Sequence, residues 1–319
     1  MPLRLLALAL ALPSFLAASP ASSQPTWPTR PVEMIIPWPA GGGVDSMGRT
    51  IASALASELG QNVVIANRDG AAGTIGFNAL ASAAPDGYVL GGGPTTPIAN
   101  APFLVKGVRY DVDSFEYVCQ YWENVFAIAV TQDSPFKTAP DLFAAAAANP
   151  GKLTYGHAGV GSIPHLAAEN LAEALGLKVQ NVPFRGDNPM LPILLKGDLD
   201  FASTALASIR GLNLRVLAVF ADKRRANLPD APTAKELGVA HSVPPGHNGV
   251  FAPKGIPDAV RARLEGACAN AAKTEAVQKA ADNAGGGVTY LSGAQFRAQT
   301  VSDYKFKADL IRRLGLEAK

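Results

Sequence analysis

Short apolar runs rich in β-branched residues alternate along this chain with stretches whose apolar residues recur every three or four positions. Residues 32–36 predict a buried strand, and residues 46–59 predict a helix that ends at Gly60. The apolar face of that helix consists of Met47, Ile51, Leu55 and Leu59. The chain therefore begins its folded part with a strand, a turn and a helix.

The same alternation continues to the C-terminus and predicts an α/β protein. Further strands are predicted at residues 62–66, 88–90, 153–155, 179–184, 200–202 and 215–220. Further helices are predicted at residues 74–83, 140–148, 163–175, 257–273 and 293–314, with one more from residue 190. Strands that alternate with helices predict a mostly parallel sheet with helices on both faces.

Two segments are predicted to connect two such lobes. The long apolar run at residues 115–130 is interpreted as one extended strand that crosses between them, and residues 248–251 as the return crossing. The two C-terminal helices follow the return crossing, so we expect them to pack on the first lobe. One lobe is therefore predicted from residues 27–124 plus 251–319, and the other from residues 125–250.

The first predicted strand leads into a glycine-rich turn at residues 37–45, with the sequence PWPAGGGVD. The three glycines, Gly41 to Gly43, leave no side chain over the backbone N–H groups. A helix N-terminus adds free amides and a partial positive charge, so the turn suits a carboxylate or a phosphate. The alternative is a tight turn whose glycines serve only the backbone conformation.

A second glycine-rich turn repeats the arrangement at residues 156–161, with the sequence GHAGVG. Ser162 is a suitable N-cap for the helix that follows. Two turns that suit an anion, so far apart in the chain, indicate two lobes that face one ligand. The alternative is that the two turns are unrelated. Residues 91–96, which include Thr95, follow another strand at the edge where open α/β sheets bind ligands, and are a candidate third wall.

The N-terminal segment is typical of a secretory signal peptide. Arg4 precedes an apolar run at residues 5–18, and small residues allow cleavage after Ala21. The run is shorter than the roughly 20 residues of a membrane-spanning helix. We therefore expect residues 1–21 to be removed and the mature protein to be exported, soluble and periplasmic.

Composition fits two packed lobes and excludes a nucleic-acid-binding surface. Apolar residues form 48% of the 319 residues, and the net charge is only +2. The chain has no basic run with interleaved aromatic residues, which nucleic-acid binding requires. Cys119 and Cys268 permit a disulfide in an exported protein, but sequence does not place them together, and two separate buried thiols are the favoured interpretation.

Catalytic and metal-binding patterns are weak. Ser162 and His165 are close in sequence, but the G-x-S-x-G elbow of a serine hydrolase is missing, and a helix cap is the better interpretation of Ser162. The four histidines have no metal-ligand spacing. Neither a P-loop nor a complete dinucleotide fingerprint occurs, so we expect no catalytic residue, no metal and no cofactor.

A series of motifs resembles the Bug family, the periplasmic solute receptors of tripartite tricarboxylate transporters. The resemblance covers nearly the whole mature chain, in order and at compatible spacing. The motifs are RPV at 30–32, the first glycine-rich turn, LGQ at 59–61, NRDGAAGTIG at 67–76, APDGY at 84–88, NPGKL at 149–153, GVGS at 159–162 with HLA at 165–167, and LPDAPT at 228–233.

The resemblance implies a two-lobed periplasmic-binding-protein fold of type II with a ligand cleft between the lobes. It implies a small carboxylate ligand, integral-membrane transporter subunits as partners, and a monomer. The ligand carboxylate would be bound by the two glycine-rich turns through backbone amides, hydroxyls and waters. The matching residues are Ala40, Gly41, Gly42, Asp45, Gly161 and Ser162. Asp45 suits holding the turn or a water, or binding a ligand amine.

Four residues depart from the family pattern. Trp38 stands where a Phe is common, His157 where a small residue is common, and Arg185 where a Lys is usual. His247 lies near a position where a Trp is usual. His157, Arg185 and His247 are candidate partners of an acidic ligand.

Three functions follow as hypotheses. The first is a solute-binding protein that captures a small organic acid for uptake. The second is a periplasmic sensor that presents the same ligand to a signalling partner. The third is an exported hydrolase that uses Ser162, which would require turnover and a nucleophile–base hydrogen bond.

Overall fold

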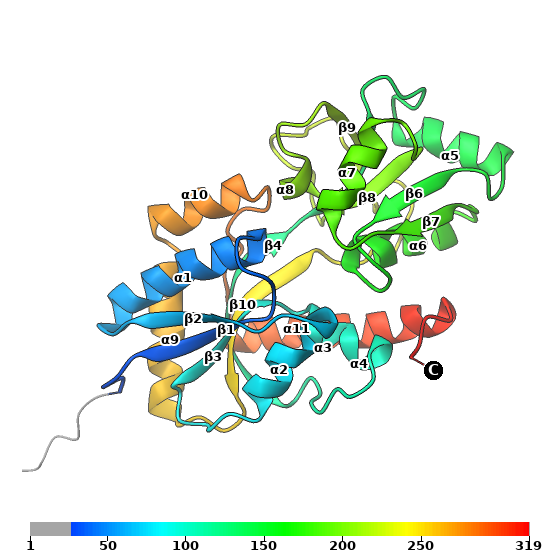
Figure 1. Ribbon diagram of the computed structural model, residues 1–319. Helices are drawn as coiled ribbons and strands as arrows, with labels where there is room; N and C mark the ends of the chain where they lie inside the picture. The colour runs from blue at the N-terminus through cyan, green and yellow to red at the C-terminus, as the bar shows by residue number, and fades with distance from the viewer. Residues whose placement is uncertain (1–26, 319) are drawn as a thin grey trace, which may run out of the picture.

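The computed structural model describes residues 27–318, which form two sheets with helices on both faces of each (Figure 1). The predicted signal peptide, residues 1–21, lies outside the described residues. The first sheet has the strand order β11-β4-β10-β3-β1-β2, and the second has the order β7-β6-β8-β5-β9. The two-lobed α/β fold predicted from the sequence is confirmed.

The first sheet contains β1 (Val32–Ile36), β2 (Val63–Asn67), β3 (Val89–Pro94), β4 (Phe115–Asn124), β10 (Gly246–Pro253) and β11 (Leu291–Ser292). One of its faces packs against α1 (Gly43–Leu59), α9 (Asp258–Ala271) and α10 (Glu275–Asn283). The other packs against α2 (Thr74–Ala81), the one-turn α3 (Thr96–Ala99) and the start of α11 (Gly293–Arg313). A one-turn helix η1 (Ala71–Gly73) precedes α2, and the short α4 (Ala101–Leu104) follows α3.

The second sheet contains β5 (Phe126–Thr131), β6 (Thr154–His157), β7 (Gln180–Pro183), β8 (Phe201–Ala205) and β9 (Leu214–Phe220). Helices α5 (Ala139–Ala148) and α6 (Ile163–Ala174) cover one face. Helices α7 (Asp187–Leu195) and α8 (Leu206–Ile209) cover the other.

Both sheets are mixed, so the prediction of mostly parallel sheets is wrong. In the first sheet only β1 pairs in parallel, with β2 and β3, whereas β10 runs antiparallel to β3 and β4. In the second sheet β5 runs antiparallel to β8 and β9. The reason is that β5 and β10 are the strands by which the chain enters each sheet from the other, and such a strand can join without a helical crossover.

The crossing from the first sheet to the second is a single residue, Val125, between β4 and β5. The run at 115–130 is therefore two strands of different sheets rather than the single strand expected. The return crossing precedes β10, which pairs with β3 and β4 from Gly246 onward. The division into lobes at 124/125 and 250/251 stays a prediction, and this pairing favours a second boundary before Gly246.

Cys119 of β4 and Cys268 of α9 form a disulfide, so the expectation of two separate thiols is wrong. Helix α9 packs across the face of the first sheet, which brings the two Cα atoms to 6.5 Å. Both residues are fully buried in the apolar core between α1, α9 and β4. The contact depends on helix packing between segments 149 positions apart, which no local pattern reveals.

Helix α11 packs on both lobes, whereas the sequence predicted packing on the first lobe only. At its start, Phe296 packs against Tyr117 and Phe251 of the first sheet. At its end, Leu310 and Ile311 are fully buried in the core of the second sheet. Figure 1 shows the helix starting among the elements of the first lobe and ending beneath those of the second. Helix α11 therefore fastens the two lobes together in addition to the two crossings.

Most predicted helices and strands are confirmed to within a few residues, but α10 was not predicted. Its buried residues, Val277 and Ala281, are four positions apart on one helix face, so its sequence carries a helical signal that was missed. No helix within residues 27–318 is long and apolar enough to cross a membrane.

Candidate functional site

The first glycine-rich turn joins β1 to α1 at the carboxyl end of a parallel strand. Gly42 is the N-cap, and no side chain caps the helix. The amides at the start of α1 therefore lack the partners that a helix N-terminus needs. Residues 39–43 are exposed, so an anion has open access to these amides.

Asp45 holds this turn in place. One of its carboxylate oxygens accepts hydrogen bonds from the Gly41 amide and from Arg49 Nε, both at 2.9 Å, and the other accepts from Asn67 Nδ2 at 2.9 Å. Burial alone would raise the pKa of this carboxyl, but the hydrogen bonds from Arg49, Gly41 and Asn67 outweigh it and lower the pKa. Asp45 therefore stays ionised and acts as the anchor of the turn.

Trp38 belongs to this turn, and its ring lies next to Gly73. Its backbone oxygen accepts a hydrogen bond from Asn67 Nδ2 at 3.0 Å. Its ring lies against Gly73, where a Cβ atom would approach the ring to 3.0 Å and Pro97 to 2.7 Å. A residue without a side chain at position 73 thus leaves room for the indole ring and for Pro97 of α3.

The second glycine-rich turn joins β6 to α6, and several of its amides already have partners within the turn and the helix that follows. Ser162 is the N-cap, as predicted, and its Oγ accepts a hydrogen bond from the His165 amide at 3.4 Å. The Gly161 amide donates to His165 Nδ1 at 3.0 Å, and the Ser162 amide donates to the Gly159 oxygen at 3.1 Å. The Ser162 Oγ accepts in its bond with the His165 amide, so its hydroxyl hydrogen is still available to a ligand.

This geometry argues against a hydrolase. The ring of His165 does not bind the Ser162 hydroxyl, because its Nδ1 accepts from the Gly161 amide. Its Nε2 lies 3.8 Å from the Glu169 carboxylate. Ser162 therefore lacks the base that would activate it as a nucleophile.

His157 and His165 stack face to face beneath the second turn, with ring centroids 4.2 Å apart. Burial lowers the pKa of both, that of His165 to about 4, and the neighbouring His157 contributes to the shift of His165. His157 Nδ1 lies 3.0 Å from the Gly159 oxygen, and its buried Nε2 has no partner within residues 27–318. Both rings are therefore neutral near pH 7.

The second turn contacts the first lobe directly. The side-chain amide of Asn100, between α3 and α4, donates to the Gly161 oxygen at 3.1 Å. A Cβ atom on Gly161 would come within 2.2 Å of Leu104 in α4. Asn100 was not predicted from the sequence, because its partner lies 61 positions away.

The remaining predicted site residues lie in different surroundings. Thr95 follows β3, and its buried hydroxyl has no partner in the described part of the chain. Asn248, opposite Pro94 in the sheet, also has a buried side-chain oxygen without a partner there. Arg185 is exposed just after β7. Thr95 and Asn248 together supply unused polar atoms at the carboxyl end of β3.

His247 points toward α11. Its Nε2 lies 2.7 Å from Gln299 Nε2, and the ring is 2% exposed. Burial and the nearby charge of Lys307 lower the pKa of His247 to about 3. The ring is therefore neutral and packed between the first sheet and the helix.

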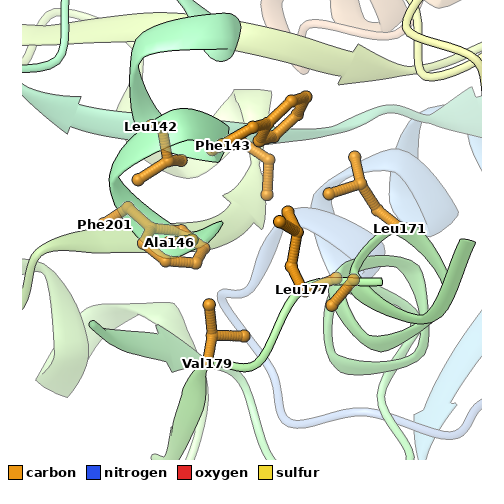
Figure 2. A pocket seen from close by; sticks show the side chains of 10 residues that line it. Leu142, Phe143, Ala146, Leu171, Leu177, Val179 and Phe201 are labelled. Atoms are coloured by element: carbon orange, nitrogen blue, oxygen red, sulfur yellow. The ribbon is translucent and has the colours of Figure 1, made fainter. Parts of the chain in front are cut away.

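A cavity inside the second lobe is too small and too apolar for an organic acid. It has a volume of about 20 Å³ and lies between α5, α6 and the sheet. Figure 2 shows that the side chains around it are aliphatic or aromatic, among them Leu142, Phe143 and Leu171. The cavity is a packing defect of the lobe core rather than a ligand site. Within residues 27–318, no cluster of His, Cys, Asp and Glu is arranged to hold a metal ion.

Residues 47–316 match the model of the tripartite tricarboxylate transporter family receptor, TctC. The chain belongs to this family. It is 34% identical over 309 residues to a UPF0065 protein encoded in the gbd 5′ region of Cupriavidus necator, covering 94% of this chain and 93% of the relative. It is 30% identical over 308 residues to protein BugT of Bordetella pertussis, covering 95% and 94%. The resemblance found in the sequence is therefore confirmed, and the family consists of receptors rather than enzymes.

Solved structures of solute-binding proteins share the fold. A TctC solute-binding protein from Polaromonas is 30% identical with a TM-score of 0.78, covering 90% of this chain and all of that one. An R. palustris protein with adipate is 27% identical, with a TM-score of 0.79 and coverage of 91% and 98%. MatC from Rhodopseudomonas palustris with bound malate is 26% identical, with a TM-score of 0.76 and coverage of 89% and 100%.

Proposed function

We propose that this receptor binds a small carboxylate, most simply a dicarboxylate, between its two glycine-rich turns and presents it to the membrane subunits of a tripartite transporter. The observation that carries the proposal is the open N-terminus of α1. Its amides are exposed, uncapped and surrounded by glycine, while Asp45 fixes the turn from behind. Aligned amides with a partial positive charge favour a carboxylate over a neutral group.

The chemistry of related proteins supports a carboxylate. The two relatives of known structure described above hold adipate and malate, and both molecules are dicarboxylates. Each carries two acidic groups on a short carbon chain. The two turns suit a ligand that places one carboxylate at the first turn and its other carboxylate near the second turn.

We assign the following roles within this site. The amides of Gly42 and Gly43 bind the carboxylate, and Ala40 and Gly41 shape the loop around it. The Ser162 hydroxyl donates to the ligand, and Trp38 closes one side of the site. Thr95 and Asn248 offer unused polar atoms to the rest of the ligand, and Arg185 attracts an acidic ligand from the exposed rim. We leave His247 out of the set because its ring faces Gln299 of α11.

The cellular setting is part of the proposal. The motifs at the N-terminus favour export to the periplasm with removal of residues 1–21, and the receptor family implies membrane subunits as partners. The protein works as a monomer with the lobe division described above.

Titration calorimetry on the purified mature protein tests this function. The panel contains acetate, malate, adipate and citrate, with adipamide as a neutral analogue of adipate. We expect saturable binding of at least one dicarboxylate and none of adipamide, because the diamide lacks the charge that the helix N-terminus favours. Binding of adipamide as tight as that of adipate, or no binding to any acid of the panel, would overturn the proposal.

A further inference from the structure

The backbone of Gly161 is held from two sides by buried side chains. On the side of the second lobe, its N–H donates to His165 Nδ1 at 3.0 Å. On the side of the first lobe, its C=O accepts from Asn100 Nδ2 at 3.1 Å. Asn100 is 1% exposed and His165 is 2% exposed, so both hydrogen bonds are protected from water. Buried hydrogen bonds of this kind are costly to leave unmade.

The backbone at Gly161 is shaped for this contact. Its φ of +75° is a left-handed conformation that favours glycine. The absence of a side chain lets Leu104 of α4 approach the backbone, since a Cβ there would lie 2.2 Å from Leu104 Cδ1. The second turn thus contacts the first lobe through a backbone that only glycine allows.

We propose that Asn100 and His165 are positioning residues that latch the Gly161 backbone between the two lobes and hold the lobes in the arrangement seen in this structure. The inference rests on the proposed carboxylate site, because Ser162, the next residue, supplies the ligand hydroxyl. His165 fixes the turn within its own lobe, and Asn100 fastens the turn to the other lobe. A ligand that contacts Ser162 is then retained for as long as these two hydrogen bonds are formed.

The latch requires one tautomer of His165. Because Nδ1 accepts the Gly161 amide, the ring proton is on Nε2, which faces Glu169 Oε1 at 3.8 Å. The other titratable groups around this ring belong to β6. Tyr155 donates its hydroxyl to Glu169 at 2.6 Å, and His157 stacks on the ring. Asn at position 165 would keep an acceptor close to the place of Nδ1, whereas Leu would remove it.

The first experiment needs no ligand. Spin labels at Asp69→Cys and Asn188→Cys, exposed residues of the first and second lobe, report the distance between the lobes. Asn100→Leu keeps the size of the side chain but removes the donor to Gly161. We expect this variant to shift the ligand-free protein toward longer distances. Asn78→Leu is the matched control, because Asn78 also donates to a backbone oxygen, that of Gly107, but within the first lobe.

A distance distribution for Asn100→Leu identical to that of the wild type would overturn the inference. The role of His165 is tested by hydrogen exchange of the Gly161 amide. We expect His165→Leu to speed this exchange at least tenfold and His165→Asn to restore most of the protection. Unchanged exchange in both variants would show that His165 does not position the turn.

The second experiment follows ligand dissociation by stopped flow, with the acid of the panel that binds best. Loss of the buried Asn100–Gly161 hydrogen bond between the lobes should raise koff about fivefold to tenfold in Asn100→Leu and leave kon unchanged. A wild-type protein that binds no acid of the panel would refute the proposed function alone, since the ligand-free distances still decide the latch. Tight wild-type binding with equal koff in Asn100→Leu would refute the latch alone.

Discussion

Lys307 donates a hydrogen bond from Nζ to Asp303 Oδ2 at 2.7 Å, one turn apart on α11, and both side chains are almost completely inaccessible to solvent. The pair lies where α11 passes from the first lobe to the second, close to His247. Burial raises the pKa of Asp303, and the charge and hydrogen bond of Lys307 offset only part of that rise. Each charge therefore depends on the other.

Replacing Lys307 with Met should destabilise the protein by about 3–5 kcal/mol, because it leaves Asp303 buried without its partner. Replacing both residues, as Lys307→Met with Asp303→Leu, should recover most of this loss, since no buried charge remains. Urea unfolding of the variants measures both effects. Lys279→Met is the matched control, because its i,i+4 pair with Glu275 is largely exposed and is worth well under about 1 kcal/mol. Equal losses at Lys307 and Lys279 would contradict the interpretation.

Removing the disulfide should lower stability without changing the ligand site. The bond joins residues 149 positions apart, and both sulfur atoms lie in the core on the far side of the first sheet from α11. We expect Cys119→Ala with Cys268→Ala to cost about 2–5 kcal/mol in urea unfolding and to leave the ligand affinity unchanged. Thiol titration of the denatured, unreduced wild-type protein should find no free thiol; two reactive thiols would show that the bond does not form.

Stability should fall as the pH is lowered from about 6.5 toward 4. The pKa of His165 is lowered to about 4 and that of His247 to about 3, from an ordinary value of 6.5. Above pH 6.5 both residues are neutral in the folded and unfolded states, so their contribution to the free energy of unfolding is fully present. As the pH falls, the unfolded state takes up protons first, and each buried histidine removes up to about 1.4 kcal/mol per pH unit until its folded pKa is reached.

The histidine contribution is isolated by comparison with variants. His165 faces His157 and Glu169, and His247 faces Lys307 and Gln299, so each ring sits in a different charge environment. His247→Gln or His165→Asn should flatten the slope of unfolding free energy against pH, whereas His241→Gln, at an exposed position, should leave it unchanged. Identical slopes in all four proteins would rule out this explanation.

Ser162 has two roles that a single substitution separates. Its Oγ caps α6, and its hydroxyl hydrogen is assigned to the ligand. Ser162→Ala should lower stability by about 1 kcal/mol and weaken ligand binding about fivefold to tenfold. Ser162→Thr keeps both groups and should restore both properties. Calorimetric titration and thermal unfolding provide the two readings, and an affinity of Ser162→Ala equal to that of the wild type would remove Ser162 from the site.

Local chemistry explains which features could be predicted from sequence. Gly60, Ser162 and the glycine-rich turns signal their own conformations, since helix caps and strand-to-helix turns depend on residues close together in the chain. The alternation of strands and helices, supported by the family motifs, predicted two α/β lobes. The sequence also placed Asp45 in the first turn, where the structure shows it as the anchor.

The features that were missed depend on contacts between distant segments. The Cys119–Cys268 bond requires the packing angle of α9, and the Asn100–Gly161 hydrogen bond requires the approach of the two lobes. The burial of Leu310 in the second lobe likewise depends on the direction of α11. The hydrogen bond from the Gly161 amide to His165 was also missed, although the two residues are close in sequence. It depends on a side-chain rotamer and a ring tautomer.

The central claim is that the free amides at the start of α1 bind a ligand carboxylate, and Gly43→Pro tests it most directly. Proline is favoured at the first helical position and lacks the N–H, so the substitution removes one donor while keeping the helix. The site tolerates it, because Gly42 is extended at φ −77° and ψ 170° and a Cβ on Gly43 would have no neighbour within 4 Å. Glu275→Pro, at the exposed first position of α10, is the matched control.

Calorimetric titration of Gly43→Pro, Glu275→Pro and the wild type with the best acid of the panel is the deciding measurement. A charge-assisted hydrogen bond is worth about 1.5–3 kcal/mol, so Gly43→Pro should weaken binding by roughly tenfold to a hundredfold. Its thermal unfolding should match that of the wild type, and Glu275→Pro should bind normally. A folded Gly43→Pro protein with wild-type affinity would contradict the account.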